Sequence, residues 1–135
     1  MRIHHIGYAV FEIEKTIVEL EKIGYVRTTE IISDVNRKVN ICFLKNDGYV
    51  VELVQGLSDS SPVANFLKKS GVGTYHICYI SKNIEETTKK LIEYGYMLID
   101  ALSFAPAISK TARVAFFYRL DVGLIEIVCD LEPTA

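Results

Sequence analysis

The alternation of apolar and polar residues predicts the strands of this chain, and two stretches with helical spacing interrupt it. Residues 3–10 and 74–81 alternate and are rich in Ile, Val and Tyr, which is typical of strands. Residues 12–23 and 84–94 carry apolar side chains at the spacing of an amphipathic helix. A glycine follows each helical stretch, and glycine enters the left-handed conformation of a helix end at little cost. The chain therefore begins each half with a strand and a helix.

Three further strands are predicted after each helix, at 25–33, 38–45, 49–55, 96–101, 112–119 and 123–129. The sequence KNDG at 45–48 favours a hairpin turn, because Asp-Gly accepts positive φ angles. RLDVG at 119–123 lies at the matching place in the second half. The pattern predicts two tandem βαβββ modules.

A connector separates the modules. We predict module one at 1–56, the connector at 57–73 and module two at 74–130, all within a single domain of residues 1–135. Ser61 and Pro62 favour a short helix that starts there and ends at Gly71, with Ser61 as its cap. Residues 102–112 are expected to form a loop, and the last five residues are expected to fray.

The two modules repeat each other in sequence. A shift of 71 residues aligns 3–28 with 74–99 without a gap and gives nine identities, among them His5 with His76. Internal repetition indicates two copies of one supersecondary unit. A shared core explains recurring apolar residues, but it does not require a recurring histidine.

A second polar residue recurs on the last strand of each module. YVVELV at 49–54 aligns with GLIEIV at 123–128, which places Glu52 on Glu126. Both are surrounded by branched apolar residues, and a buried carboxylate is costly unless a cation or strong donors compensate it. Two imidazoles and two carboxylates form a nitrogen and oxygen ligand set that suits Zn, Ni, Co, Mn or Fe(II) rather than Ca.

Other interpretations of these residues stay open at this stage. A single histidine on a strand is more often a core or surface residue than a ligand, and each glutamate could form a salt bridge with Lys38, Lys110 or Arg113. Lys110 and Arg113 flank the 102–112 loop and could instead hold a substrate carboxylate or phosphate. Phe104 and Phe116 favour core or loop packing.

Composition excludes several classes of function. A net charge of −2, from 15 basic and 17 acidic residues, gives no electrostatic reason to expect nucleic acid or an anionic membrane surface as a partner. No apolar run reaches the roughly 20 residues of a membrane span. Three cysteines without paired spacing and no signal peptide predict reduced thiols and a cytoplasmic location.

The sequence resembles the vicinal oxygen chelate superfamily over about residues 2–129. The motifs that carry the resemblance are HHIGYAV with His5, YVVELV with Glu52, TYHICYI with His76 and GLIEIV with Glu126. The stretch 58–79 is similar to methylmalonyl-CoA epimerases and small bacterial glyoxalase I enzymes. The resemblance implies an α+β fold of two βαβββ modules whose mixed sheets curl around a cleft, and one divalent metal ion (Ni, Co, Zn or Mn) bound by His5, Glu52, His76 and Glu126.

The resemblance also implies proton-transfer chemistry. Iron dioxygenases of the superfamily use two His and one Glu, so a second Glu favours the enzymes that move a proton alpha to a carbonyl through a metal-bound enediolate. Substrates of that class are a 2-acyl thioester or a thiol–aldehyde hemithioacetal. By this resemblance Glu126 is the base, and Glu52 is either a ligand or a second base. The 102–112 loop departs from the epimerase pattern, so the substrate stays open.

Two hypotheses follow. The first is an isomerase or lyase of the glyoxalase I or methylmalonyl-CoA epimerase type, and the alternative is a protein of the same fold that binds and sequesters a small molecule such as an antibiotic. We also expect a homodimer, because open sheet edges favour pairing.

Overall fold

A computed structural model describes residues 1–132, and residues 133–135 of the tail expected to fray lie outside that range. Within it the chain forms nine strands and three helices. In chain order they are β1 (Ile3–Val10), α1 (Ile13–Lys22), β2 (Val26–Arg27), β3 (Ile32–Asp34), β4 (Val39–Asn46), β5 (Tyr49–Gly56), α2 (Ala64–Ser70), β6 (Gly73–Ile80), α3 (Ile84–Glu93), β7 (Met97–Phe104), β8 (Arg113–Arg119) and β9 (Gly123–Cys129). The predicted α+β fold of two βαβββ modules is confirmed.

The chain divides into two compact units, which we describe separately. The first unit is His5–Tyr75, and the second unit comprises Met1–His4 and the chain from His76 onward. In the first unit the strand order is β2-β4-β5-β1, and β3 also pairs with β4. Strand β1 runs parallel to β5, from Ile6 opposite Val51 to Val10 opposite Gln55. The other pairs are antiparallel, so the sheet is mixed.

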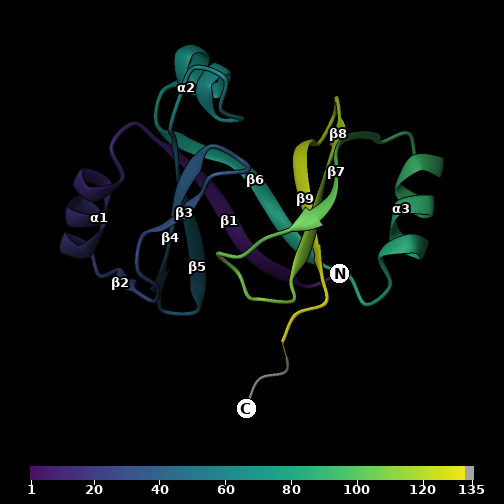
Figure 1. Cartoon of the computed structure of the whole chain (residues 1–135), viewed down its shortest axis with the longest axis horizontal. Coiled ribbons are helices and arrows are strands. Elements are labelled where there is room, and N and C mark those ends of the chain that lie inside the picture. The colour runs from purple at the N-terminus through teal and green to yellow at the C-terminus, as the bar shows by residue number, and fades with distance from the viewer. Residues whose placement is uncertain (133–135) are drawn as a thin grey trace. The chain divides into compact units, whose positions relative to one another are not determined.

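The second unit repeats this arrangement with the strand order β6-β9-β8-β7. Strand β6 runs parallel to β9, and β8 pairs antiparallel with both β9 and β7. Figure 1 shows the helix that follows the first strand of each module: α1 contacts β4 and β5, whereas α3 contacts β7 and β9. One helix thus packs on one face of each sheet.

Each unit has its own apolar core between its helix and its sheet. In the first unit Ile13 and Ile17 of α1 pack on Leu44 and Leu53, and Tyr8 packs against the same cluster. In the second unit Ile84 and Leu91 of α3 pack with strand residues, including Phe117 and Ile127, and with Tyr79. Removal of this apolar area from water supplies most of the stability of each unit. It also fixes the register of the strands, because a slip of one residue would expose every core side chain.

Several predicted boundaries change in the structure. The predicted strand 25–33 is two short strands, because Thr28 and Thr29 turn aside between them and bond to Phe43. The prediction of Ser61 as a helix cap is wrong: α2 begins at Ala64, its cap position is Val63, and no side chain caps it. Strand β7 extends to Phe104, so the loop before β8 is shorter than predicted.

Other local predictions are confirmed. Gly24, Gly71 and Gly95 follow the three helices with positive φ angles. Asn83 caps α3, because its Oδ1 accepts a 3.0 Å hydrogen bond from the backbone N–H of Glu86. Asp47 has a φ of 56°, as the hairpin turn between β4 and β5 requires. In the described range no helix is long and apolar enough to cross a membrane.

Candidate metal centre

His5 and Glu52 form a buried pair in the first unit. The Nε2 atom of His5 lies 3.4 Å from Oε1 of Glu52, and their side chains are 0% and 6% exposed. They lie on neighbouring parallel strands, where Glu52 is opposite Gly7, two residues after His5. Since side chains alternate along a strand, His5 and Glu52 project from the same face of the sheet. Tyr8 projects from the opposite face and packs with Ile13 and Ile17 of α1.

His76 and Glu126 form the same pair in the second unit. Nε2 of His76 lies 3.1 Å from Oε1 of Glu126, and their side chains are 0% and 5% exposed. Glu126 is opposite Cys78, two residues after His76, on the parallel strands β6 and β9. The repeat in the sequence therefore corresponds to a repeat of geometry, with one buried His–Glu pair in each unit.

A phenylalanine ring contacts the histidine of each pair, and this contact was not predicted from the sequence. Phe43 is opposite Glu52 on β4, and its ring meets that of His5 edge-on, with centroids 5.3 Å apart at 80°. Phe116 is opposite Glu126 on β8, and its ring meets that of His76 at 5.4 Å and 88°. Such edge contacts restrict the imidazole orientation. The clue in the sequence was available, because both phenylalanines lie on the strand before the one that carries the glutamate.

The chemistry of each pair fits a divalent metal ion. A carboxylate that is about 95% buried is expensive to keep charged, and a divalent cation offsets this cost more fully than a neutral imidazole does. Nitrogen from His and oxygen from Glu are donors that Zn, Ni, Co and Mn accept. One His and one Glu supply only half of a four-ligand set, so neither pair alone makes a complete centre.

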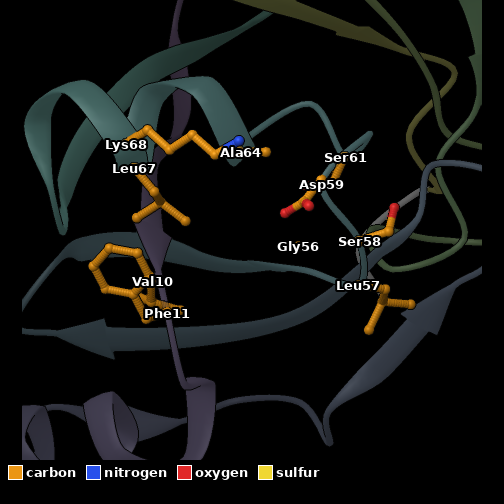
Figure 2. A pocket seen from close by; sticks show the side chains of 10 residues that line it. All are labelled: Val10, Phe11, Gly56, Leu57, Ser58, Asp59, Ser61, Ala64, Leu67 and Lys68. Atoms are coloured by element: carbon orange, nitrogen blue, oxygen red, sulfur yellow. The ribbon is translucent and has the colours of Figure 1, made fainter.

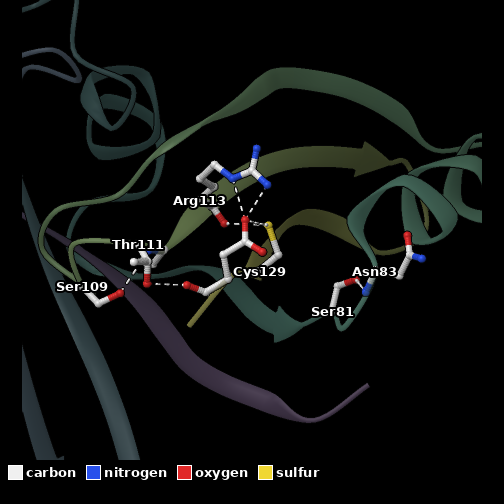
Figure 3. A network of polar contacts seen from close by, with 8 residues as sticks. Ser81, Asn83, Ser109, Thr111, Arg113 and Cys129 are labelled. Atoms are coloured by element: carbon white, nitrogen blue, oxygen red, sulfur yellow. Dashed lines mark hydrogen bonds and ion pairs between the residues drawn. The ribbon is translucent and has the colours of Figure 1, made fainter. Parts of the chain in front are cut away.

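The two basic residues predicted to contact substrate differ in their surroundings. Lys110 is exposed in the loop before β8. Arg113 is engaged within its own unit, because its guanidinium forms an ion pair with Asp130 and its Nε donates a 2.7 Å hydrogen bond to the same carboxylate (Figure 3). That hydrogen bond raises the pKa of Arg113. Arg113 therefore has a partner within its own unit, and a substrate contact through Lys110 or Arg113 stays a prediction.

The other possible salt bridges of the glutamates can also be checked against the structure. Lys38 donates to the hydroxyl of Ser60, and Arg113 pairs with Asp130, so neither is the salt-bridge partner of Glu52 or Glu126.

Phe104 is 65% exposed rather than packed in the core, and Phe116 contacts His76. Cys78 is fully buried in an apolar cluster with Val114 and Val128.

Residues 4–116 match the model of the Glyoxalase/Bleomycin resistance protein/Dioxygenase superfamily. The chain belongs to this superfamily. The resemblance on which the sequence analysis relied, the vicinal oxygen chelate superfamily, is thereby confirmed.

Relatives and solved structures agree with this assignment. The chain is 31% identical to the uncharacterised protein YqjC of Bacillus subtilis, over 96% of this chain and 91% of that protein. It is 28% identical to the mitochondrial methylmalonyl-CoA epimerase of Bos taurus, over 93% of this chain and 73% of that enzyme. A hypothetical protein of Bacillus halodurans has a similar structure, with a TM-score of 0.85, 27% identity and coverage of 99% and 97%. The methylmalonyl-CoA epimerase of Mycobacterium tuberculosis shares the fold, with a TM-score of 0.81, 21% identity and coverage of 97% and 88%.

Proposed function

We propose that this protein is a divalent-metal-dependent enzyme that moves a proton alpha to the carbonyl of a 2-acyl thioester, as methylmalonyl-CoA epimerases do. The repeated buried His–Glu pair is the observation that carries the proposal. The epimerase relatives support the epimerase type over the glyoxalase I type. A protein that only sequesters a ligand has no need of two buried carboxylates next to imidazoles.

In this proposal one metal ion is held by both pairs together, with the ligands His5, Glu52, His76 and Glu126. The internal repeat supports a shared site, because each module contributes the same two residue types in the same local geometry. When bound, the metal would act as a Lewis acid that stabilises negative charge on the substrate oxygen. Ni, Co, Zn and Mn all accept this donor set, and the fold does not select among them.

Glu126 is the proposed base. Its carboxylate is 4% exposed, so water has little access to it. The Oε1 atom of Glu126 lies beside Nε2 of His76, so the side chain has a fixed direction. Glu52 has the matching environment in the first unit and is the proposed donor to the opposite side of the planar substrate carbon. Removal on one side and return on the other would invert the configuration of that carbon.

The environment of each half-site supports this role for the carboxylates. Phe43 and Phe116 cover one side of the imidazoles and limit the access of water. Exclusion of water strengthens the electrostatic interactions of a site and prevents loss of the proton to solvent in the middle of the reaction.

The experiment is to incubate the metal-loaded protein with 2-methylmalonyl-CoA in deuterium oxide. We expect exchange of the alpha hydrogen and interconversion of the two epimers, both followed by NMR and chiral analysis. Glu126→Gln should lower exchange by about 100-fold or more, the usual contribution of a general base. Glu52→Gln should suppress epimerisation more than exchange, because it removes the second proton donor. Glu85→Gln, an exposed change in α3, is the matched control and should have no effect.

Absence of exchange with Ni, Co, Zn and Mn in turn would overturn the proposed activity. If exchange also fails with a methylglyoxal hemithioacetal while small apolar ligands raise the melting temperature, the sequestration alternative holds. Unchanged exchange in Glu126→Gln would overturn the assignment of the base while leaving the reaction class in place.

A further inference from the structure

Strand β7 forms the open edge of the sheet in the second unit. It is the last strand of the order β6-β9-β8-β7, and Figure 1 shows it beside β8, the only strand that pairs with it in the described part of the chain. Backbone N–H and C=O groups on the outer side of an edge strand point away from the sheet. Because β7 is eight residues long, it presents such groups over roughly 26 Å.

The side chains of β7 are mostly apolar and exposed. The strand MLIDALSF contains one charged residue, Asp100, and neither lysine nor proline. Its large apolar side chains with exposed fractions between 44% and 65% are Met97, Leu98, Ile99 and Phe104. Proteins protect an edge strand from pairing by keeping it short, by charges or proline, or by bulges. β7 has two register shifts against β8 and one charge, so most of its length stays open to pairing.

The corresponding edge of the first unit is protected. The sequence repeat aligns β7 with residues 26–33, where the chain forms the short strands β2 and β3, of two and three residues. Between these strands the hydroxyl of Thr28 donates to the carbonyl of Phe43, and the hydroxyl of Thr29 accepts from the N–H of Phe43. Side chains thus satisfy backbone groups at the place where a long edge strand would lie. A long open edge is therefore a feature of the second unit alone.

This difference between the edges favours a second copy of the chain as the partner. Two chains that pair through β7 use the long edge of each, and the protected edge of the first unit offers no comparable strand to a third chain. The assembly therefore closes as a twofold dimer. A twofold axis perpendicular to the sheet reverses the strand direction, so the two β7 strands run antiparallel. Only a register centred on Asp100 would place the two carboxylates opposite each other, and the other registers place Asp100 opposite an uncharged residue.

The exposed area of β7 sets the expected affinity. A fully exposed large side chain offers roughly 200 Å², so the four half-exposed side chains offer roughly 400 Å² per chain. With the backbone and the smaller side chains, two chains together bury roughly 1,000 Å² at most, which is the lower limit for a specific interface. We therefore expect a dissociation constant in the micromolar range.

We propose that the protein forms a twofold dimer in which β7 pairs antiparallel with β7 of a second copy. The pairing satisfies the open backbone groups of both strands and continues the sheet of one second unit into that of the other copy. The sequence predicts a homodimer only in general terms, whereas the structure assigns its interface to one edge. The proposal rests neither on the metal centre nor on the proposed reaction, so its test needs neither metal nor substrate.

The test is sedimentation velocity of the full chain across the micromolar concentration range. We expect a reversible equilibrium between monomer and dimer. Ile99→Lys places a positive charge on the edge of both copies and should weaken the dimer by at least about tenfold. Met97→Lys is a second variant of the same kind, and circular dichroism confirms that each variant is folded. Val26→Lys is the matched control, because Val26 is 65% exposed in the edge strand β2 of the first unit, and it should leave the dimer unchanged.

Hydrogen exchange locates the contact within the chain. Protection of backbone amides in β7 should rise with protein concentration, whereas protection of the amides in β2 should not change. A monomer at every concentration would overturn the proposal, as would wild-type association of both Ile99→Lys and Met97→Lys. Loss of association in Val26→Lys, assemblies larger than a dimer, or exchange along β7 that does not depend on concentration would each overturn it as well.

Discussion

The two units of this protein share their half-sites and differ at the ends of the strands that carry them. The His–Glu distances are 3.4 Å and 3.1 Å, and the His–Phe centroid distances are 5.3 Å and 5.4 Å. Beyond these strands the first unit has a pocket lined by both apolar and polar residues (Figure 2), whereas the second unit has the hydrogen bonds of Ser81 and Asp130. The repeated geometry points to chemistry that needs both modules, and the divergent strand ends point to roles that belong to one module.

The largest expected effect concerns the core of the second unit, which supports its half-site. Phe117 is fully buried, and its replacement by Ala should lower the free energy of unfolding by about 3–5 kcal/mol. Phe104 is 65% exposed in the same unit and is the matched control, with an expected change within about 0.5 kcal/mol for Phe104→Ala. Urea unfolding followed by circular dichroism measures both. Equal losses would contradict the assignment of the core.

The next effect tests the divergent strand ends. Ser81→Ala removes a hydroxyl that bonds to both Thr87 and the N–H of Asn83, and it should cost about 1–2 kcal/mol. At the equivalent position of the first unit, Val10→Thr adds a hydroxyl to a fully buried apolar site and should also destabilise. The same denaturation assay applies. If Ser81→Ala is neutral, the polar network does not stabilise the end of β6.

A smaller effect is expected from the aromatic partner of each half-site. Phe43→Leu and Phe116→Leu remove the edge contact to an imidazole, worth about 0.5–1.5 kcal/mol, which is roughly two- to tenfold in cobalt affinity. Competition titration with a chromophoric chelator measures the affinity. Phe66→Leu, which disturbs a ring pair with Tyr75 outside the half-sites, is the control and should bind cobalt like the wild type. If only one of the two half-site variants loses cobalt affinity, the two half-sites are not equivalent.

The smallest effect is a dependence of stability on alkaline pH. Burial raises the pKa of Cys42 in the first unit and of Cys129 in the second. A raised pKa in the folded state means that unfolded thiols ionise first, so this contribution to stability is complete below about pH 8.5 and declines above it. Cys42→Ala combined with Cys129→Ala should flatten the decline between pH 8 and pH 10 in thermal denaturation. An unchanged slope would contradict the prediction.

The helices, the strands and the repeated His and Glu residues could be predicted from the sequence, because each recurs there at a regular spacing. The internal repeat identifies His76 and Glu126 as the equivalents of His5 and Glu52. The role of Phe116 was missed because a phenylalanine next to apolar neighbours looks like any core residue. Its contact with His76 depends on the pairing of β8 with β9, which periodicity alone does not specify.

The errors of the sequence analysis have a similar cause. Ser61 before Pro62 is typical of a helix start, but the loop makes a further turn before α2. The cap position is Val63, and the helix begins at Ala64. The ion pair of Arg113 with Asp130 was not predicted, because Asp130 is 17 residues away in sequence and adjacent only after β8 pairs with β9. Contacts between residues distant in sequence were thus the part that local patterns could not supply.

The most direct test of the account is the stoichiometry and affinity of cobalt binding in the wild type and in three alanine variants. The wild type should bind about one ion per chain, because the proposed centre takes its four ligands from both modules. His5→Ala and His76→Ala should each lose at least about 100-fold in affinity, whereas Glu85→Ala, an exposed change in α3, is the control and should bind like the wild type. Isothermal titration calorimetry measures all four proteins. Two ions per wild-type chain, or wild-type affinity in either His5→Ala or His76→Ala, would contradict a single centre built from both modules.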